Sequence, residues 1–171
     1  MDLTKRKMTN LRKIDNFLPR EEFEVLQKEI ISDTFPIYFQ NCVTDDEETQ
    51  SIKNVNFIHL IYSNNLSTSS YYKMIDEILF SKLKIRSLIR SKVNCYPRTD
   101  QIIEHPWHTD TPYKHTGMLF YLNTCNGETR FGEESVQSKE NRIVFFDPSK
   151  IHASTSCTDQ KCRWNIIANY F

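Results

Sequence analysis

The chain has 171 residues, a formal net charge of zero and a hydrophobic content of 39%. This length is most simply one domain, so we expect residues 1–171 to fold around one core. The balanced charge gives no general attraction to nucleic acid or to an anionic membrane, and the hydrophobic content is too high for a disordered chain.

The N-terminal part of the sequence predicts two helices. The first begins at Pro19, which suits an opening turn, and its apolar residues repeat at helical spacing: Phe23, Leu26 and Ile30. The second is expected over residues 71–80, and a strand over 55–62 separates the two. We expect residues 1–13 to be a polar lead-in and the acidic stretch 45–50 to be a solvated loop.

From residue 83 onward the pattern changes to short apolar segments that are typical of β-strands. The expected strands cover 85–97, 117–123, 128–131, 135–138, 142–146, 152–155 and 162–171. Many short strands after two helices predict a mainly β (α+β) chain. The β core is expected over roughly 83–171, and the helices of roughly 14–82 are expected to pack on one side of it. A sandwich or a jelly roll fits this number of strands.

Three residues in the β half form a candidate metal-ligand set. His108 and Asp110 are two positions apart, a spacing that puts both side chains on one face of a strand. His152 lies at a predicted strand–turn–strand corner, from which it can complete a set of two imidazoles and one carboxylate. Such a set leaves coordination positions open and is the usual choice of non-heme Fe(II) oxygenases. The other histidines are not expected in it: His59, His105 and His115.

The order of these motifs resembles the Fe(II)- and 2-oxoglutarate-dependent dioxygenase superfamily, and within it the prolyl 4-hydroxylase-like branch with its short phage and bacterial members. The resemblance extends over residues 93–171 and rests on Tyr96, His108–Asp110, 120–123, 145–148, His152 and 163–171. It implies a double-stranded β-helix, or jelly-roll, core. It also implies Fe(II) bound by the three ligands above, 2-oxoglutarate as cosubstrate and O₂ as oxidant.

Four further residues are expected to contact 2-oxoglutarate. Arg163 is the predicted anchor for the distal carboxylate, because a guanidinium binds a carboxylate through two parallel hydrogen bonds. Tyr121 lies where prolyl-hydroxylase relatives place a carboxylate-binding tyrosine. Asn94 and Tyr96 have an Asn-x-Tyr form that is similar to the nucleic-acid demethylases of the superfamily, where both residues touch the cosubstrate. The alternative for each tyrosine is a packed amphipathic core residue.

The resemblance implies hydroxylation of a protein side chain, or of a small molecule such as an amino acid. Three departures from the prolyl-hydroxylase pattern leave prolyl specificity open. No glycine follows Tyr96, the links to His108 and from His152 to Arg163 are longer than usual, and Asn169 stands where those enzymes often have tryptophan.

Two alternatives remain open at this point. A nucleic-acid demethylase could use the basic stretch from Lys82 to Arg98 to follow phosphates, although we interpret this stretch as the solvated edge of a strand. Demethylases also carry a second arginine after the anchor, whereas Arg163 is the last arginine here. A non-catalytic β-barrel binding module with a relic metal site is the third interpretation.

The five cysteines form no Cys-x-x-Cys motif, which is typical of reduced thiols in the cytosol. A zinc site from Cys157, Cys162 and His115 lacks paired spacing and is not expected. Because no secretory signal and no apolar stretch of spanning length are visible, we expect a cytoplasmic protein without membrane contact. A nucleic-acid partner is not expected, and the sequence predicts neither the substrate nor the oligomeric state.

Overall fold

The computed structural model describes residues 11–43 and 54–171. In chain order the elements are β1 (Arg12–Ile14), α1 (Arg20–Ile30), β2 (Tyr38–Gln40), β3 (Asn56–Ser63), β4 (Leu66–Ser67), α2 (Tyr72–Ile78), the 3-10 helix η3 (Phe80–Lys82), β5 (Leu88–Pro97), β6 (Thr116–Tyr121), β7 (Glu128–Phe131), β8 (Glu134–Gln137), β9 (Arg142–Phe146), β10 (Ala153–Ser154) and β11 (Cys162–Tyr170). The predicted lead-in 1–13 and the predicted loop 45–50 fall largely outside these residues.

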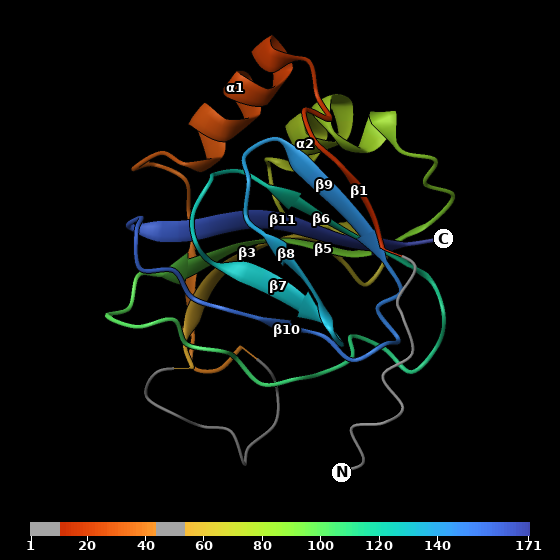
Figure 1. Cartoon of the computed structure of the whole chain (residues 1–171). Coiled ribbons are helices and arrows are strands. Elements are labelled where there is room, and N and C mark those ends of the chain that lie inside the picture. The colour runs from red at the N-terminus through yellow and green to blue at the C-terminus, as the bar shows by residue number, and fades with distance from the viewer. Residues whose placement is uncertain (1–10, 44–53) are drawn as a thin grey trace.

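The strands form two antiparallel sheets. The larger one has eight strands in the order β1-β9-β6-β11-β5-β3-β2, with β4 paired to β3, and the smaller one has the order β10-β7-β8. Figure 1 shows the small sheet on one side of the large sheet and both helices on the other. The mainly β, jelly-roll architecture with helices on one side is therefore confirmed. The N-terminal part, expected mainly as helical support, also contributes β1 to β4 to the large sheet.

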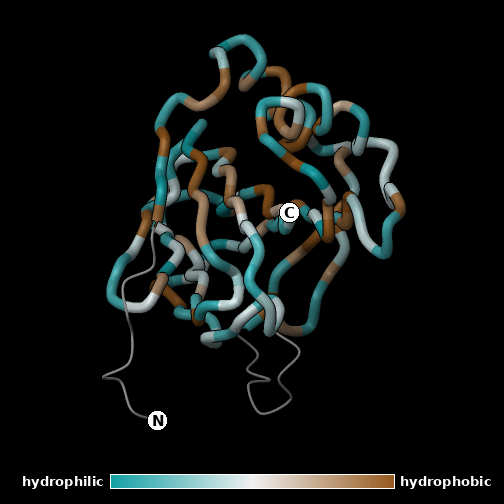
Figure 2. The backbone as a smooth tube through the Cα atoms, turned by 90° about the vertical axis from the view of Figure 1, so that its right-hand side faces the viewer, coloured by the Kyte–Doolittle hydropathy of each residue, from teal (hydrophilic) through white to brown (hydrophobic). Residues whose placement is uncertain are grey.

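The helices form because apolar residues at helical spacing pack against the sheet. Phe23, Leu26 and Ile30 of α1 are fully buried, in a cluster with strand residues such as Phe120 and Ile166. These strand residues alternate with residues that face the small sheet, as strand geometry requires. Hydrophilic and hydrophobic segments accordingly alternate along the chain, and the helices again lie above the strands in the rotated view (Figure 2).

The opposite face of the large sheet packs against the small sheet. A second apolar cluster joins Leu119 and Tyr121 of β6 to Phe131 of β7 and Val136 of β8. Polar side chains occupy the rest of this face on β5 and β11, at the centre of the large sheet. The part of the chain that the structure describes contains no helix long and apolar enough to cross a membrane.

The predicted bounds of β7 and β9 agree with the structure, and α1 begins one residue after Pro19. β2 and β4 are absent from the prediction. They are short strands beside β3, and their exposed Tyr38, Phe39 and Leu66 show no alternation of buried and exposed residues. Their strand form arises from pairing with β3, which the local sequence does not encode.

Candidate metal centre and adjoining pocket

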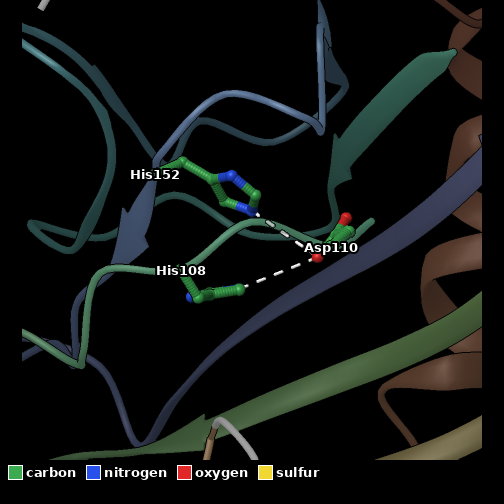
Figure 3. A group of neighbouring side chains, drawn as sticks. All are labelled: His108, Asp110 and His152. Atoms are coloured by element: carbon green, nitrogen blue, oxygen red, sulfur yellow. Dashed lines mark ion pairs between the residues drawn. The ribbon is translucent and has the colours of Figure 1, made fainter. Parts of the chain in front are cut away.

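The side chains of His108, Asp110 and His152 meet where the segment that carries His108 and Asp110 pairs with the segment that carries His152. Nε2 of His108 and Nε2 of His152 each lie 3.7 Å from Oδ1 of Asp110. Figure 3 shows both rings turned toward this one carboxylate oxygen. The structure therefore brings together all three residues that the sequence predicted as metal ligands.

The expectation that His108 and Asp110 share the face of a strand is wrong. Both lie in an irregular segment, where the only ladder contact of His108 is an isolated antiparallel bridge with His152. The backbone amides of His108 and His152 each donate a hydrogen bond of 2.9 Å to the carbonyl of the other residue. The Asp110 amide donates to the Pro148 carbonyl. The positions of His108 and Asp110 are thus set by backbone pairing with the segment before β10, and not by the alternation of side chains along a strand.

The hydrogen bonds of both imidazoles suit metal ligation. Nδ1 of His108 bonds the Pro106 carbonyl at 3.1 Å, and Nδ1 of His152 bonds the Lys150 carbonyl at 2.9 Å. Because a carbonyl only accepts, each Nδ1 donates its proton to it, and in the neutral ring Nε2 then has the lone pair that a metal ion needs. Metal-binding histidines commonly have this arrangement, in which the second nitrogen donates to a backbone carbonyl.

The spacing of the three ligand atoms also fits one ion. Ligands that lie roughly 2.1 Å from a shared divalent ion can be at most about 4.2 Å apart. The separations of 3.7 Å from Asp110 to both imidazoles satisfy this limit. All three ligand atoms lie within 4.8 Å of one another, so these residues would be able to hold one divalent ion and leave other coordination positions open.

The charge states agree with a cation site. Burial, followed by the neighbouring His152, lowers the pKa of His108, so that this ring is neutral near pH 7. Burial opposes ionisation of Asp110, but His152, Asn169 and His108 outweigh it and hold the pKa of Asp110 well below its usual range. The ionised carboxylate of Asp110 beside the neutral ring of His108 leaves a negative charge at the site for a metal ion to balance.

A pocket begins at the triad and runs along the concave faces of β5 and β11. His108, Asp110 and His152 line it, together with the predicted cosubstrate contacts Asn94 and Tyr96. Asn165 and Asn169 line it too, as their alternation with Arg163 along the last strand predicts. Thr129 and Ser154 also line it and were not predicted. Asn94 and Asn165 are joined by a 2.9 Å hydrogen bond between their side chains.

Arg163 lies at the end of the pocket remote from Asn169, and it is fully buried. Its Nη1 donates to the Thr155 carbonyl at 3.0 Å and its Nη2 to Oγ1 of Thr129 at 2.6 Å, whereas Nε has no partner. The guanidinium lies 5.2 Å from the ring centre of Tyr96 and 5.6 Å from that of Tyr121. No acidic side chain of the described residues forms an ion pair with it, and an unpaired buried cation is costly. An anionic ligand would remove this cost.

Thr129 connects the predicted anchor to the pocket. Arg163 and Tyr121 do not line the pocket themselves, but both donate hydrogen bonds to Oγ1 of Thr129, which does. The four predicted cosubstrate residues are thus gathered in one place, with Asn94 and Tyr96 at the wall and the other two behind Thr129. Thr129 could not be found from the sequence, because its position depends on how the small sheet packs on the large one.

His105, which was excluded as a ligand, supports Tyr96 instead. Its ring stacks on Tyr96 with centroids 5.1 Å apart, and its Nδ1 bonds Oγ of Ser154 at 2.8 Å. Burial, and then the charge of Arg163, lowers the pKa of His105 to about 3. The ring is therefore a neutral part of the wall behind the pocket.

The interpretation of the basic stretch as the solvated edge of a strand is wrong for two of its residues. β5 lies inside the large sheet, between β11 and β3. Arg90 and Lys92 lie on its concave face, in alternation with Asn94 and Tyr96, and line the pocket. Both also line an adjoining pocket that reaches Trp107 and His108. Among the described residues that line these two pockets, Asp110 is the only one with a carboxylate.

Comparison with known proteins shows where this fold occurs. No family model matches the sequence, and no curated protein matches it. A prolyl-4-hydroxylase from Pseudomonas putida superposes with a TM-score of 0.62 at 14% identity, covering 98% of this chain and 96% of that one. A prolyl hydroxylase from Trichoplax adhaerens, in complex with a hypoxia inducible factor peptide fragment, gives 0.64 at 16% identity and covers 99% and 86%.

The fold also occurs in an enzyme of a different reaction type. The non-heme alpha ketoglutarate dependent carbocyclase SnoK from nogalamycin biosynthesis gives a TM-score of 0.64 at 9% identity, covering 98% of this chain and 81% of that one. At these identities the likeness establishes the shared fold over nearly the whole chain. It does not transfer an activity or a substrate.

Proposed function

We propose that the chain is an Fe(II)- and 2-oxoglutarate-dependent oxygenase that hydroxylates a protein side chain or a small molecule such as an amino acid. The observation that carries this proposal is the His108–Asp110–His152 group, whose ligand atoms converge at the mouth of a polar pocket. Such a facial set leaves positions for a cosubstrate and for oxygen. The fold, shared with 2-oxoglutarate oxygenases, supports the same assignment.

In this proposal Fe(II) would be held by Nε2 of His108, Nε2 of His152 and the carboxylate of Asp110. The backbone carbonyls of Pro106 and Lys150 fix the protonated nitrogen of each ring, so neither imidazole has to reorganise when the ion binds. Bound Fe(II) and 2-oxoglutarate together would supply the activation of O₂ for insertion of oxygen into a C–H bond.

The far carboxylate of 2-oxoglutarate would lie at the Arg163 end of the pocket. Arg163 provides the positive charge there, and the Thr129 hydroxyl lies between that charge and the pocket. Tyr96 and Tyr121 flank the guanidinium and exclude water from it. A charge-assisted hydrogen bond is stronger in such a dry, low-dielectric site than in water.

The substrate would enter from the adjoining pocket. Arg90 and Lys92 line this pocket next to His108, together with the aromatic Trp107. Two cations near the ion favour a substrate that carries a carboxylate or another anionic group close to the reacting carbon. An amino acid and an acidic peptide both meet this requirement.

A nucleic-acid demethylase remains a second candidate because Arg90 and Lys92 could also hold a phosphate. The products separate the two candidates. Demethylation releases formaldehyde, whereas hydroxylation leaves the new oxygen on the substrate. A methylated oligonucleotide and a mixture of free amino acids, assayed side by side, should give formaldehyde only if the demethylase is correct.

The test of the proposed function is conversion of 2-oxoglutarate to succinate by protein loaded with iron under anaerobic conditions and then exposed to O₂. Slow succinate formation without substrate is expected for the wild-type chain and not for His108→Ala. Lys73→Ala is the matched control, because this exposed residue of α2 lies outside both pockets and its loss should keep the uncoupled turnover. Binding of neither iron nor 2-oxoglutarate would instead support the non-catalytic binding module.

A further inference from the structure

A second group of potential metal ligands lies in the two loops that flank Arg163, and it shares no residue with the triad. Cys125, in the loop before β7, meets Cys157 and Asp159, in the loop before β11. The two sulfurs and a carboxylate oxygen all lie within 4.8 Å of one another. Cys125 and Cys157 are almost completely buried, and Asp159 is exposed at the surface. No step of the proposed reaction uses these residues.

We propose that Cys125, Cys157 and Asp159 form a binding site for a thiophilic divalent ion, for which zinc is the expected occupant. Two thiolate sulfurs, one carboxylate oxygen and one water molecule make a four-coordinate donor set that suits zinc. Binding would replace both thiol protons, which pass to solvent, and the exposed side next to Asp159 would admit the water. This inference is independent of the proposed oxygenase function.

The loops hold the third ligand in place through the backbone. The Asn126 amide donates to both oxygens of Asp159, at 3.0 and 3.1 Å. The Asn126 side chain is paired with Thr158 by two further bonds, Nδ2 to Oγ1 at 2.7 Å and the Thr158 amide to Oδ1 at 2.9 Å. The carboxylate is therefore fixed beside the two sulfurs before any ion binds.

This fixed carboxylate distinguishes an ion site from a simple thiol pair. Two buried thiols alone could be a packed contact or could be oxidised to a disulfide, and neither state needs Asp159. The chain contains a comparison, because Cys95 of β5 and Cys162 of β11 also have their thiols in contact. Among the described residues that pair has no imidazole or carboxylate close enough to form a group of three.

The site has a structural consequence for the proposed anchor. A Cβ on Gly127, two residues after Cys125, would lie 2.7 Å from Cδ of Arg163 and 2.5 Å from the Ser156 carbonyl oxygen. Thr155, two residues before Cys157, accepts a hydrogen bond from Arg163. The two loops thus hold the Arg163 side chain between them, and we call this arrangement the clamp on Arg163. An ion that joins the loops would keep them together and so fix the position of the guanidinium.

The test uses the full chain with the His108→Ala substitution, so that the first site does not compete for metal. Metal-free, reduced protein is titrated with Co²⁺ under anaerobic conditions, and the near-ultraviolet absorbance of thiolate-to-cobalt charge transfer is recorded. We expect the band to saturate at one equivalent and to disappear when zinc displaces the cobalt. The imidazole and carboxylate ligands of the first site cannot produce such a band.

Three variants on this background locate the site. Cys157→Ser should abolish the band, and Asp159→Asn, an exposed change that leaves the core intact, should weaken zinc binding at least tenfold. Cys162→Ser is the matched control, because it removes a thiol of the other pair and should leave the band unchanged. Circular dichroism confirms that each variant is folded.

Three results would overturn the inference. They are no band in the reduced protein, a band that survives Cys157→Ser, and isolation of the chain under reducing conditions with a Cys125–Cys157 disulfide that excludes metal. None of them bears on the oxygenase proposal, because the His108 site is tested by succinate formation in the otherwise wild-type chain.

Discussion

Asn169 donates a hydrogen bond of 3.0 Å from its Nδ2 to Oδ2 of Asp110, and thereby leaves Oδ1 of the same carboxylate facing both imidazoles. One amide on β11 thus decides which oxygen of Asp110 is presented to an ion. The chain therefore positions its carboxylate ligand from the central strand of the sheet.

Replacing Asn169 should weaken metal binding without unfolding the protein. We expect Asn169→Ala to raise the Kd for Fe(II), measured anaerobically, by about 10- to 100-fold, as is typical when the partner of a ligand is lost. The exposed Thr109, between His108 and Asp110, provides the control, since Thr109→Ala should leave the Kd unchanged. An unaltered Kd in Asn169→Ala would show that Asp110 is oriented by other contacts.

Changes at Arg163 should affect the binding of 2-oxoglutarate more than that of iron. A charge-assisted hydrogen bond contributes about 1.5–3 kcal/mol. Arg163→Met should therefore weaken the binding of 2-oxoglutarate roughly 10- to 150-fold. Arg163→Lys keeps the charge but loses the planar fork, and an intermediate loss is expected. Anaerobic calorimetry with the iron-loaded protein measures both. Equal affinity in all three proteins would remove Arg163 from the cosubstrate site.

Gly127 packs against Arg163 with no room for a side chain. Gly127→Ala adds a Cβ within 2.7 Å of the Arg163 side chain and 2.5 Å of the Ser156 carbonyl. Overpacking of this kind typically lowers the free energy of unfolding by about 1–3 kcal/mol. Displacement of the guanidinium should also weaken the binding of 2-oxoglutarate. Urea unfolding and calorimetry test the two effects. The exposed Ser135→Ala on β8 should change neither.

The stability of the metal-free protein should fall in acid partly because of His105. Its pKa is lowered to about 3 in the folded state, whereas the unfolded value is about 6.5. The unfolded chain therefore binds the proton first, and stability is lost as the pH falls from about 6.5 to about 3, by up to ~1.4 kcal/mol per pH unit. Above pH 6.5 this group should contribute no pH dependence.

His105→Phe keeps an aromatic ring against Tyr96 and removes the titrating group. Its free energy of unfolding should decline less steeply between these pH values than that of the wild-type chain. Urea unfolding at several pH values gives both slopes. Parallel slopes would mean that His105 is protonated as readily in the folded protein as in the unfolded chain.

The sequence predicted the elements whose signals are local. Helix α1 follows from apolar spacing after Pro19, and β7 and β9 follow from alternation between turn residues. The triad was found because the order of its three residues along the chain resembles that of the dioxygenases, although the strand expected to carry His108 and Asp110 is an irregular segment. Their convergence with His152 depends on backbone pairing, which residue spacing does not report.

Other features depend on the packing of distant segments. Thr129 reaches Arg163 only because the small sheet covers β11, and Asn169 reaches Asp110 only through the order of strands. By contrast, the inward direction of Arg90 and Lys92 was readable, because they alternate with Asn94 and Tyr96 along one strand. Treating the basic stretch as one solvated surface obscured that period-two signal.

The most direct measurement of the central claim is anaerobic absorbance spectroscopy of the protein with Fe(II) and 2-oxoglutarate. When a keto acid binds Fe(II), a charge-transfer absorbance appears in the visible region, and it requires no knowledge of the substrate. We expect this band for the wild-type chain, its loss in His152→Ala, and a need for more 2-oxoglutarate to produce it in Arg163→Lys. A wild-type chain that binds neither Fe(II) nor 2-oxoglutarate, and shows no band, would contradict the proposed function.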